Sequence, residues 1–274
     1  MKNTISVLMS LYEKESPSFL VMCLNSLKVQ SRPADEIIIV VDGNIGFDLA
    51  VILNEYKNTL PIEIIYLPNS LGLGAALNEG LKFCKGNLIA RMDTDDICMK
   101  DRLEKQENYF DSYDVDILGS AAFVIDFSGE HIGERVNPST HNAIIDSLWC
   151  NPFIHPSVMF KKVSIDSIGS YNPELRRRQD YELWFRAAKN GLKLANLEDK
   201  LIKYRFGRHT LKKQSPSLAL KQAFIGFNGC LSCNLGMIKA IICFIPFFRS
   251  LMPVNLQMKF TTLLHRFDFR ARGK

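Results

Sequence analysis

Three carboxylates, Asp93, Asp95 and Asp96, directly follow a largely apolar run at residues 88–92. Two unit charges about 4 Å apart repel by roughly 1 kcal/mol in water and about 4 kcal/mol at the intermediate dielectric of a cleft. Either solvent screens these acids or a cation lies among them. A solvated turn with a helix-capping aspartate explains one such acid well and three poorly. Because Mg²⁺ and Mn²⁺ prefer carboxylate oxygens and substrate phosphates, the cluster predicts a divalent cation that neutralises a departing diphosphate.

Four apolar runs of strand length, each followed by an amphipathic helical stretch, position this cluster. The runs lie at residues 5–12, 36–43, 62–68 and 87–93. Repeated strand and helix units with continuous apolar strands predict an α/β fold with a mostly parallel central sheet and helices on both faces. Ligands of such sheets bind beyond the carboxyl ends of the strands.

Polar residues follow each predicted strand at that edge: Glu13, Asp42, Asn69 and the aspartate cluster. Farther along the chain, the pattern predicts a long strand and hairpin from residue 116, a strand at 155–162, a helix from Asp180 that ends at Gly191, and two late strands. The glycine-rich stretch at 72–80 is an imperfect dinucleotide fingerprint, because Leu77 occupies a position that requires a small residue. We interpret it as a turn and helix start.

Four motifs in order, SVLMSLYE, EIIIVVDG, LPNSLGLGAALNEGLKFCKGNLIARMDTDD and RRRQDYELWFRAAKNG, resemble inverting family 2 glycosyltransferases over about residues 4–210. The resemblance implies the GT-A nucleotide-diphospho-sugar transferase fold, with Mn²⁺ or Mg²⁺ as cofactor. In that family the tip of the first strand and the acid after the second strand bind the uracil and the ribose, and Glu13 and Asp42 occupy those positions here. The resemblance further implies that Asp93 lies near the ribose, that Asp95 binds the metal, and that Asp96 supports it. The implied nucleotide-sugar site comprises Tyr12, Glu13, Asp42, Asn69, Arg91, Asp93 and Asp95.

The resemblance also assigns a catalytic base to an acidic pair that opens a late helix. Gln179 replaces the first acid here, so the role falls on Asp180, with Glu182 as the second candidate. A carboxylate must take the proton of the acceptor hydroxyl in a one-step displacement, although an aspartate at a helix start can equally be an N-cap.

Three further residues have two possible roles. His209 follows the last strand, where relatives place a histidine on the metal or diphosphate, but an isolated histidine is more often structural. His155 lines an acceptor pocket or belongs to a turn before Pro156. Trp149 is a candidate for sugar stacking, whereas the apolar neighbours of Trp184 indicate core packing.

Basic residues are concentrated at the end of the chain. Residues 200–274 hold 14 Lys and Arg against Asp268 alone, a formal charge of +13, whereas residues 1–199 carry −8. The apolar segment at 237–248 is interrupted by Lys239 and Pro246, so it falls short of the roughly 20 residues of a membrane span. We predict a catalytic domain at 1–214, with a nucleotide-sugar half at 1–97 and an acceptor half at 98–214. A basic amphipathic helical tail at 215–274 would lie on an anionic membrane surface.

Other partners fit the chain less well. No nucleic-acid-binding motif accompanies the basic tail, so we expect no nucleic acid partner. A solvated basic face remains the simplest alternative. Seven cysteines, mostly within apolar stretches, indicate reduced thiols, and the Cys230–Cys233 pair lacks the other ligands of a zinc site.

The resemblance implies a specific reaction. The chain lacks the transmembrane helices and QxxRW signature of processive synthases, so we expect transfer of a single hexose. Short members of this kind build O-antigen or exopolysaccharide units on undecaprenyl diphosphate, and we predict UDP-galactose as donor. The protein would be cytoplasmic and peripheral on the inner face of the plasma membrane. The alternatives are a sugar-1-phosphate nucleotidyltransferase, whose glycine-rich signature after the first strand is absent, and a non-catalytic membrane scaffold.

Overall fold

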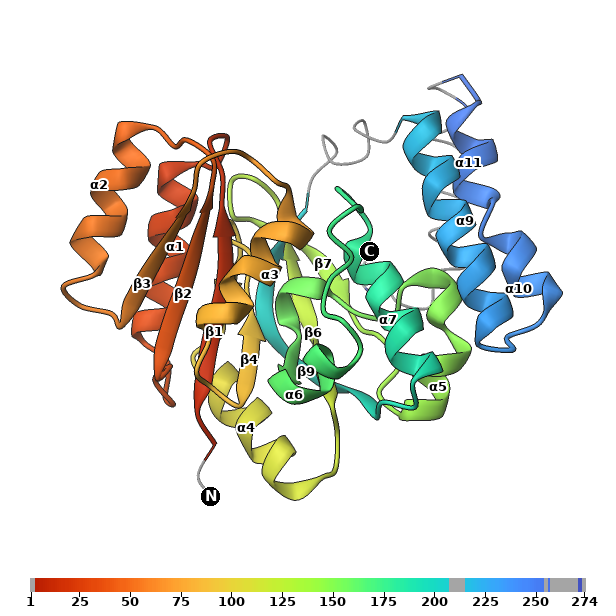
Figure 1. Ribbon diagram of the computed structural model, residues 1–274, viewed down its shortest axis with the longest axis horizontal. Coiled ribbons are helices and arrows are strands. Elements are labelled where there is room, and N and C mark those ends of the chain that lie inside the picture. The colour runs from red at the N-terminus through yellow and green to blue at the C-terminus, as the bar shows by residue number, and fades with distance from the viewer. Residues whose placement is uncertain (1–2, 207–214, 254–255, 257–270, 273–274) are drawn as a thin grey trace.

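A parallel four-stranded sheet forms the first half of the protein in a computed structural model, which describes residues 3–206, 215–253, 256 and 271–272 (Figure 1). Its strands, in spatial order, are β3 (Ile62–Leu67), β2 (Glu36–Asp42), β1 (Ile5–Leu11) and β4 (Leu88–Arg91). Leu8 lies opposite Ile38 on one side and Arg91 on the other. Since all four strands run in the same direction, their carboxyl ends share one edge, as the sequence predicts.

The second half extends this sheet with antiparallel strands. Beyond β4 come β8 (Met159–Lys161), β6 (Ile117–Ile125), β7 (His131–Arg135) and β10 (Ala271–Arg272). Two strands pair off this path: β9 (Leu194–Arg205) runs parallel to β6, and β5 (Ile97–Cys98) pairs with β9.

Two details differ from the sequence prediction. The strand expected at 155–162 is shorter, because His155–Ser157 form a 3-10 turn before β8. The two late strands are one, β9, whose pairing with β6 shifts register near Ala121. The polar residues Glu198 and Asp199 lie within this irregular stretch of β9.

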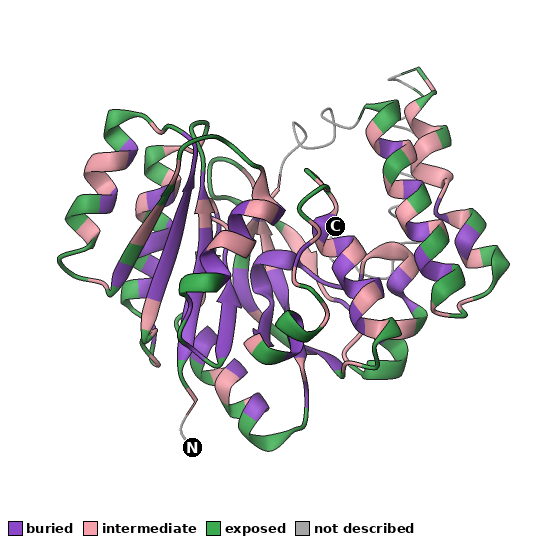
Figure 2. Cartoon of the chain, in the orientation of Figure 1, coloured by how far each residue is buried: buried purple, intermediate pink, exposed green. Residues whose placement is uncertain are grey.

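Helices cover both faces of the sheet, and a large hydrophobic core forms on each face (Figure 2). Odd-numbered residues of β1 pack on α1 (Pro17–Lys28), α2 (Phe47–Tyr56) and α4 (Arg102–Ser112). Leu8 packs on the opposite side with α3 (Leu73–Phe83), α6 (Lys162–Ser167) and α7 (Gln179–Lys189). A Cβ at Gly80 would lie 2.4 Å from Leu8 Cδ1, so this glycine lets α3 pack closely on the sheet. The interpretation of residues 72–80 as a turn and helix start is confirmed.

Beyond residue 214, the described residues begin with a long helix, α9, that packs against α7. Ser215 caps α9 (Pro216–Ser232) by accepting the Leu218 N–H at 3.3 Å, and α10 (Met237–Ile242) and α11 (Ile245–Ser250) follow. The short α5 (His141–Asp146) and a 3-10 turn at Leu148–Cys150 lie beside them. Within the described ranges no helix is long and apolar enough to cross a membrane.

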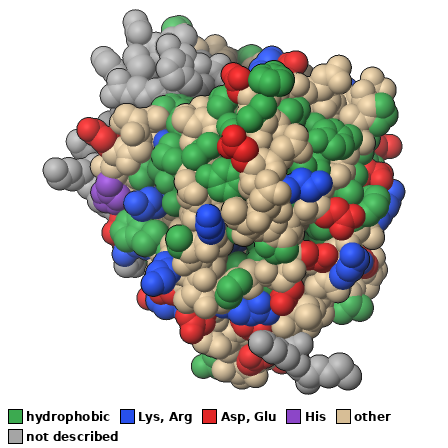
Figure 3. All heavy atoms as spheres, turned by 90° about the vertical axis from the view of Figure 1, so that its left-hand side faces the viewer, with side chains coloured by type: hydrophobic (Ala, Val, Ile, Leu, Met, Phe, Trp, Pro, Cys, Tyr) green, Lys and Arg blue, Asp and Glu red, His purple; other side chains and the backbone are tan. Residues whose placement is uncertain are grey.

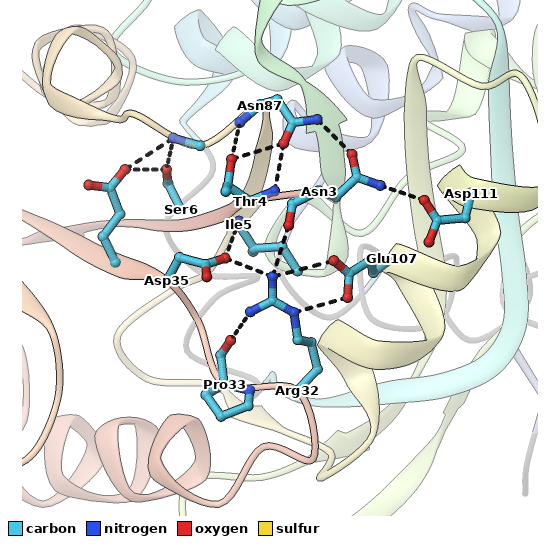
Figure 4. Close-up of polar contacts among 12 residues, drawn as sticks. Asn3, Thr4, Ile5, Ser6, Arg32, Pro33, Asp35, Asn87, Glu107 and Asp111 are labelled. Atoms are coloured by element: carbon cyan, nitrogen blue, oxygen red, sulfur yellow. Dashed lines mark hydrogen bonds and ion pairs between the residues drawn. The ribbon is translucent and has the colours of Figure 1, made fainter. Parts of the chain in front are cut away.

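A polar network closes the amino ends of β1 and β4 (Figure 4). Arg32 donates from Nη2 to Asp35 at 2.7 Å and from Nε to Glu107 at 2.9 Å. Asp35 in turn accepts the Ile5 N–H at 2.7 Å, and Asn87 accepts the Thr4 N–H at 2.7 Å. Because this network lies at the end opposite the aspartate cluster, it stabilises the fold away from the predicted site.

The outer face beside α2 and β3 has mixed charges (Figure 3). Acidic and basic side chains are interspersed there among apolar ones. Such a mixture is typical of a solvated surface.

Candidate active site

The aspartate cluster lies in the turn directly after β4. Carboxylate oxygens of Asp93, Asp95 and Asp96 all lie within 4.8 Å of one another. Arg91, which is 1% exposed, donates from Nη2 to Asp93 at 2.5 Å. Asp96 accepts the backbone N–H of Arg205 at 2.7 Å. The neighbouring strand β9 thus holds one end of the cluster and the buried Arg91 holds the other.

The cluster is electrostatically strained without a cation. Burial, reinforced by Asp93 and Glu15, raises the pKa of Asp95 to about 7. Burial and the neighbouring carboxylates also raise the pKa of Asp96 well above its usual value. Among the described residues, nothing donates a hydrogen bond to the buried Asp96 Oδ2. Three converging carboxylates with an unsatisfied buried oxygen fit Mg²⁺ or Mn²⁺ by both charge and ligand type.

Two residues that the sequence analysis did not assign to the site support this turn. Glu15 accepts a hydrogen bond from the Thr94 hydroxyl. Arg205 donates to the Asp95 carbonyl at 2.9 Å and stacks its guanidinium 4.0 Å from the centre of the Phe19 ring. Glu15 follows β1 as Glu13 does, but Glu13 is exposed and pairs only loosely with Lys14, at 4.0 Å. The loop after β1 thus contributes Glu15 to the aspartate turn, while the predicted nucleotide-binding role of Glu13 stays a prediction.

The predicted nucleotide residues lie at the same sheet edge. Tyr12 is 45% exposed, and Asn69 is exposed in the loop after β3. Asp42 is buried and accepts the N–H groups of Leu71 at 2.6 Å and Gly72 at 3.0 Å. In this structure the Asp42 carboxylate anchors the loop between β3 and α3.

A cavity of about 830 Å³ connects the aspartate cluster with the helix α7. Asp93 and Asp180 both line it. Asp180 lies in the first turn of α7 and accepts a hydrogen bond from Asn151 Nδ2 at 3.0 Å. Asn151 and Arg178 have left-handed φ angles of 56° and 65°, a conformation uncommon in residues other than glycine. Strained loops on both sides thus fix Asp180 in the cavity wall.

Two of the three predicted acceptor residues also line this cavity. His155 is hydrogen-bonded through Nε2 to the Tyr171 hydroxyl at 2.8 Å, and burial lowers the pKa of His155 well below its usual value. The imidazole is therefore neutral at physiological pH. Trp149 also lines the cavity, and its backbone carbonyl accepts a hydrogen bond from the Tyr181 hydroxyl at 2.7 Å.

The remaining predicted residues lie elsewhere. Glu182 faces Arg186, with 2.8 Å between Oε2 and Nη2, and is not among the cavity-lining residues. The structure does not bring Glu182 into the pocket, because the next turn of α7 offers it a cationic partner. Trp184 is fully buried in the core, as predicted. His209 lies outside the described residues.

Gln179, which stands where the resemblance expects an acid, both packs against a neighbouring helix and lines the cavity. It is buried, and a Cβ at Gly74 would lie 3.2 Å from its Cβ and Cγ. Its side chain therefore packs against α3. A carboxylate here would pay a larger desolvation cost than an amide.

Part of the cavity wall was not predicted. Asn151, Tyr204, Arg135 and Arg178 line it from loops and strands, and Ile242, Ile245, Pro246 and Arg249 line it from α10 and α11. The sequence signal for the second group is the pair Gly226 and Gly229. These two glycines, three residues apart on α9, allow another helix to approach closely.

Comparisons with known proteins identify the class. The family model for glycosyl transferase family 2 matches residues 6–195, and the chain belongs to this family. It is therefore a glycosyltransferase, and the nucleotidyltransferase and scaffold alternatives are excluded. The fold agrees: S. aureus TarS 1–349 in complex with UDP superposes with a TM-score of 0.68 at 19% identity, covering 96% of this chain and 80% of that one.

Three curated relatives are more similar in sequence. The amylovoran biosynthesis glycosyltransferase AmsE of Erwinia amylovora is 44% identical over 76% of this chain and 79% of its own. The Escherichia coli UDP-Gal:alpha-D-GlcNAc-diphosphoundecaprenol beta-1,3-galactosyltransferase is 35% identical over 76% of each chain. The Escherichia coli O-antigen biosynthesis glycosyltransferase WbnJ is 33% identical over 78% of this chain and 84% of its own.

Proposed function

We propose that this protein is a metal-dependent, inverting glycosyltransferase of exopolysaccharide or O-antigen synthesis. It transfers one hexose, galactose from UDP-galactose, to a sugar linked through diphosphate to a lipid such as undecaprenol. The observation that carries the proposal is that Asp93 of the aspartate cluster and Asp180 of α7 line the same cavity. A displacement with inversion needs a leaving-group site and a base on opposite faces of the anomeric carbon.

The reaction follows from this arrangement. The carboxylate of Asp180 accepts the proton of the acceptor hydroxyl, while the hydroxyl oxygen forms a bond to the anomeric carbon. The bond between that carbon and the diphosphate oxygen breaks, and its electron pair leaves with UDP. Asn151 orients the base by donating to Asp180 Oδ2 at 3.0 Å. Since a base must be held in line with its proton, this hydrogen bond contributes positioning.

The donor end of the cavity would be built around the aspartate cluster. Asp95 and Asp96 are the proposed metal ligands, with Asp93, held by Arg91, turned toward the ribose. A bound Mn²⁺ or Mg²⁺ would supply positive charge that stabilises the departing diphosphate. His209 remains a proposed additional ligand.

The identity of donor and acceptor rests on the relatives. The galactosyltransferase relative is named for UDP-Gal and a GlcNAc-diphosphoundecaprenol acceptor, and two others are named for amylovoran and O-antigen synthesis. UDP and UDP-GlcNAc are bound in the TarS structures. The proposed uridine nucleotide donor is therefore supported by the galactosyltransferase and by TarS, and the proposed lipid-diphosphate acceptor by the galactosyltransferase.

The proposed location is the inner face of the plasma membrane. Ile238 and Ile241 on α10 are 77% and 59% exposed, and Phe248 and Leu251 are each 59% exposed at the end of the described tail. Exposed apolar side chains beside basic residues suit an anionic lipid surface. Such a position would bring the cavity to a membrane-embedded acceptor.

A panel of nucleotide sugars, scored for Mn²⁺-dependent release of UDP or GDP in the presence of a lipid-diphosphate-linked sugar, tests the proposal. We expect release of UDP from UDP-galactose, dependent on both acceptor and metal. Calorimetry with UDP, with and without Mn²⁺, gives an independent measurement. Failure to bind UDP under either condition would exclude the proposed donor.

A further inference from the structure

Two cysteine sulfurs meet where α10 packs on α9, next to α7 (Figure 1). The Sγ atoms of Cys230, on α9, and Cys243, directly after α10, lie 3.8 Å apart, and both thiols are free. A Cβ at Gly226 would lie 2.7 Å from the Cys243 Sγ, so this glycine makes room for the sulfur. A disulfide would bring the two sulfurs to about 2.05 Å, a short movement for two side chains already in contact.

The two thiols have different surroundings. Cys243 lines the cavity that contains Asp180, whereas Cys230 is fully buried and is not among the lining residues. A hydrogen bond from Cys230 lowers the pKa of the Cys243 thiol, against the effect of burial. The same contact, together with burial, raises the pKa of Cys230. A redox-active pair consists of an accessible thiol with a lowered pKa and a second thiol beside it, and Cys243 and Cys230 match these two positions.

Cys243 also contacts the cavity wall beside the proposed base. Its Sγ lies 3.8 Å from the Tyr181 hydroxyl and 3.7 Å from the Trp149 carbonyl oxygen. The Tyr181 hydroxyl donates to that same carbonyl at 2.7 Å. Tyr181 follows Asp180 in α7, and both Tyr181 and Trp149 line the cavity. A displacement of the Cys243 sulfur therefore changes the contacts of the residue next to the proposed base.

We propose that Cys230 and Cys243 form a reversible disulfide on exposure to hydrogen peroxide, and that this cross-link slows sugar transfer. The cross-link itself goes beyond the proposed function, whereas its effect on transfer rests on that function. The new bond fastens the end of α10 to α9 and draws the Cys243 sulfur away from Tyr181 and Trp149. The cavity wall beside Asp180 thereby loses a contact that holds it in place.

The oxidation takes two steps, both at sulfur. The Cys243 thiolate attacks one oxygen of the peroxide, so that an S–O bond forms, the O–O bond breaks and hydroxide leaves. The Cys230 thiolate then attacks the sulfenic acid on Cys243, so that the S–S bond forms, the S–O bond breaks and a second hydroxide leaves. The two hydroxides take up the two thiol protons, and the products are one disulfide and two waters. A thiol reductant restores both cysteines by thiol–disulfide exchange.

Peptide mapping tests the cross-link directly. The purified protein is treated with hydrogen peroxide, its remaining thiols are alkylated, and it is digested with trypsin. Because trypsin cleaves after Lys239, Cys230 and Cys243 fall in separate fragments, 222–239 and 240–249. We expect the two fragments to remain joined after peroxide and to separate after treatment with dithiothreitol. Separate fragments after peroxide would show that the two residues are only packed core thiols, and would overturn the proposal.

Cys233→Ser is the matched control. Cys233 lies in the same tryptic fragment as Cys230, but its Sγ lies 3.5 Å from the Phe185 carbonyl oxygen, so we expect the joined fragment to persist in this variant. Cys230→Ala should stop the reaction at the sulfenic acid of Cys243, which dimedone labels. Alanine is chosen because a buried cysteine behaves as a small apolar residue, and the melting temperature checks that the variant folds. A joined fragment in Cys230→Ala, or its loss in Cys233→Ser, would assign the bond to Cys233 and overturn the pairing.

The rate of transfer tests the effect of the cross-link. We expect kcat of the oxidised wild type to be about tenfold lower than that of the reduced protein, because small displacements around a catalytic group are costly. Dithiothreitol should restore kcat, and the affinity for UDP measured by calorimetry should not change. Cys233→Ser should be inhibited by peroxide as wild type is, whereas Cys230→Ala should not lose activity through a cross-link.

The outcomes separate this inference from the proposed function. A joined fragment with unchanged kcat would overturn the control of transfer, and equal inhibition of wild type and Cys230→Ala would attribute the inhibition to another site. Absence of transfer from every nucleotide sugar in the reduced protein would overturn the proposed function. The peptide map decides the cross-link in that case as well, because it requires no turnover.

Discussion

The side-chain amide of Asn151 donates a hydrogen bond to the carboxylate of Asp180, with 3.0 Å between Nδ2 and Oδ2. Asn151 has a left-handed φ of 56°, and so does Arg178, two residues before Asp180, at 65°. Two unusual backbone conformations therefore converge on one carboxylate. Because such conformations cost about 1–3 kcal/mol each and persist where the surroundings fix them, their coincidence points to Asp180 as the centre of the site.

Replacement of Asp180 by asparagine should abolish most of the turnover and preserve donor binding. The amide keeps the shape of the carboxylate but cannot accept the acceptor proton, so we expect kcat to fall by about 10²–10⁴-fold. UDP affinity measured by calorimetry should stay within twofold. Glu182→Gln is the matched control, since Glu182 is paired with Arg186 outside the cavity. Wild-type turnover in Asp180→Asn would move the base elsewhere.

Asn151 should affect turnover only through its hydrogen bond to Asp180. We choose Asn151→Gly because glycine adopts a positive φ without strain, so the variant removes the amide and keeps the loop. Loss of a hydrogen bond to a charged group predicts a fall in kcat of about tenfold. In the Asp180→Asn background the same change should cost nothing further. Additive losses in this double-mutant cycle would indicate that Asn151 contacts the substrate independently.

The raised pKa of Asp95, about 7, predicts how pH changes the stability of the metal-free protein. Below pH 4 the carboxyl is protonated in both the folded and unfolded states. Between pH 4 and 7 the folded state binds more protons than the unfolded state, so this group makes stability fall as pH rises. Above pH 7 the full penalty of a buried charge beside Asp93 and Glu15 is present.

Asp95→Asn should remove this penalty. Without metal, we expect its melting temperature to exceed that of wild type at pH 8 by a few degrees, and the difference to shrink toward pH 5. Added Mn²⁺ should raise the melting temperature of wild type, more at pH 8 than at pH 5.5, and have little effect on the variant. Differential scanning fluorimetry measures both. Equal Mn²⁺ effects on the two proteins would remove Asp95 from the ligand set.

The parallel half of the fold could be predicted from the sequence, because each of its strands is a continuous run of mostly apolar residues. Residues Ile37–Val41 are buried on both sides of the sheet, so all of them are apolar. The end of the sheet at which the carboxyl ends of the parallel strands lie was therefore predictable, and the aspartate cluster lies at that end. Local pattern does not determine which loop residue turns inward, and only the structure reveals that Glu15 reaches Thr94. The nucleotide-binding role of Glu13 stays a prediction.

The acceptor side depends on packing between distant segments. Nothing in residues 237–249 reveals that Ile242 and Arg249 face a cavity, because their apolar and basic pattern fits a membrane surface equally well. Only the approach of α9 to α7 through Gly229 places them there. Similarly, the pairing of Glu182 with Arg186 is one of several possibilities on a helix, and the structure decides it.

Arg32 provides a prediction on stability alone. It joins β1, Asp35 and Glu107 at the edge opposite the site, and its side chain is only 14% exposed. Arg32→Ala removes hydrogen bonds to two carboxylates, so we expect the free energy of unfolding to fall by about 2 kcal/mol. Urea denaturation measures this loss. Unchanged kcat and UDP affinity at a temperature where the variant is folded would confirm that this network only supports the sheet.

The exposed face of α10 provides the test of membrane association. Because α10 also lines the cavity, deletion of the tail would damage the acceptor site and the lipid contact together. Ile238→Ser with Ile241→Ser changes only two outward side chains, 77% and 59% exposed, and leaves the ion pair between Lys239 and Asp146 in place. Burying an isoleucine in lipid contributes about 1.5–3 kcal/mol, so partition into phosphatidylglycerol vesicles should fall at least tenfold.

Val163→Ser, on α6 and 73% exposed, is the control and should bind vesicles as wild type does. Turnover on a water-soluble short-chain acceptor should be preserved in both variants. If the double variant binds vesicles as well as wild type, α10 is not the membrane contact, and its exposed isoleucines need another partner.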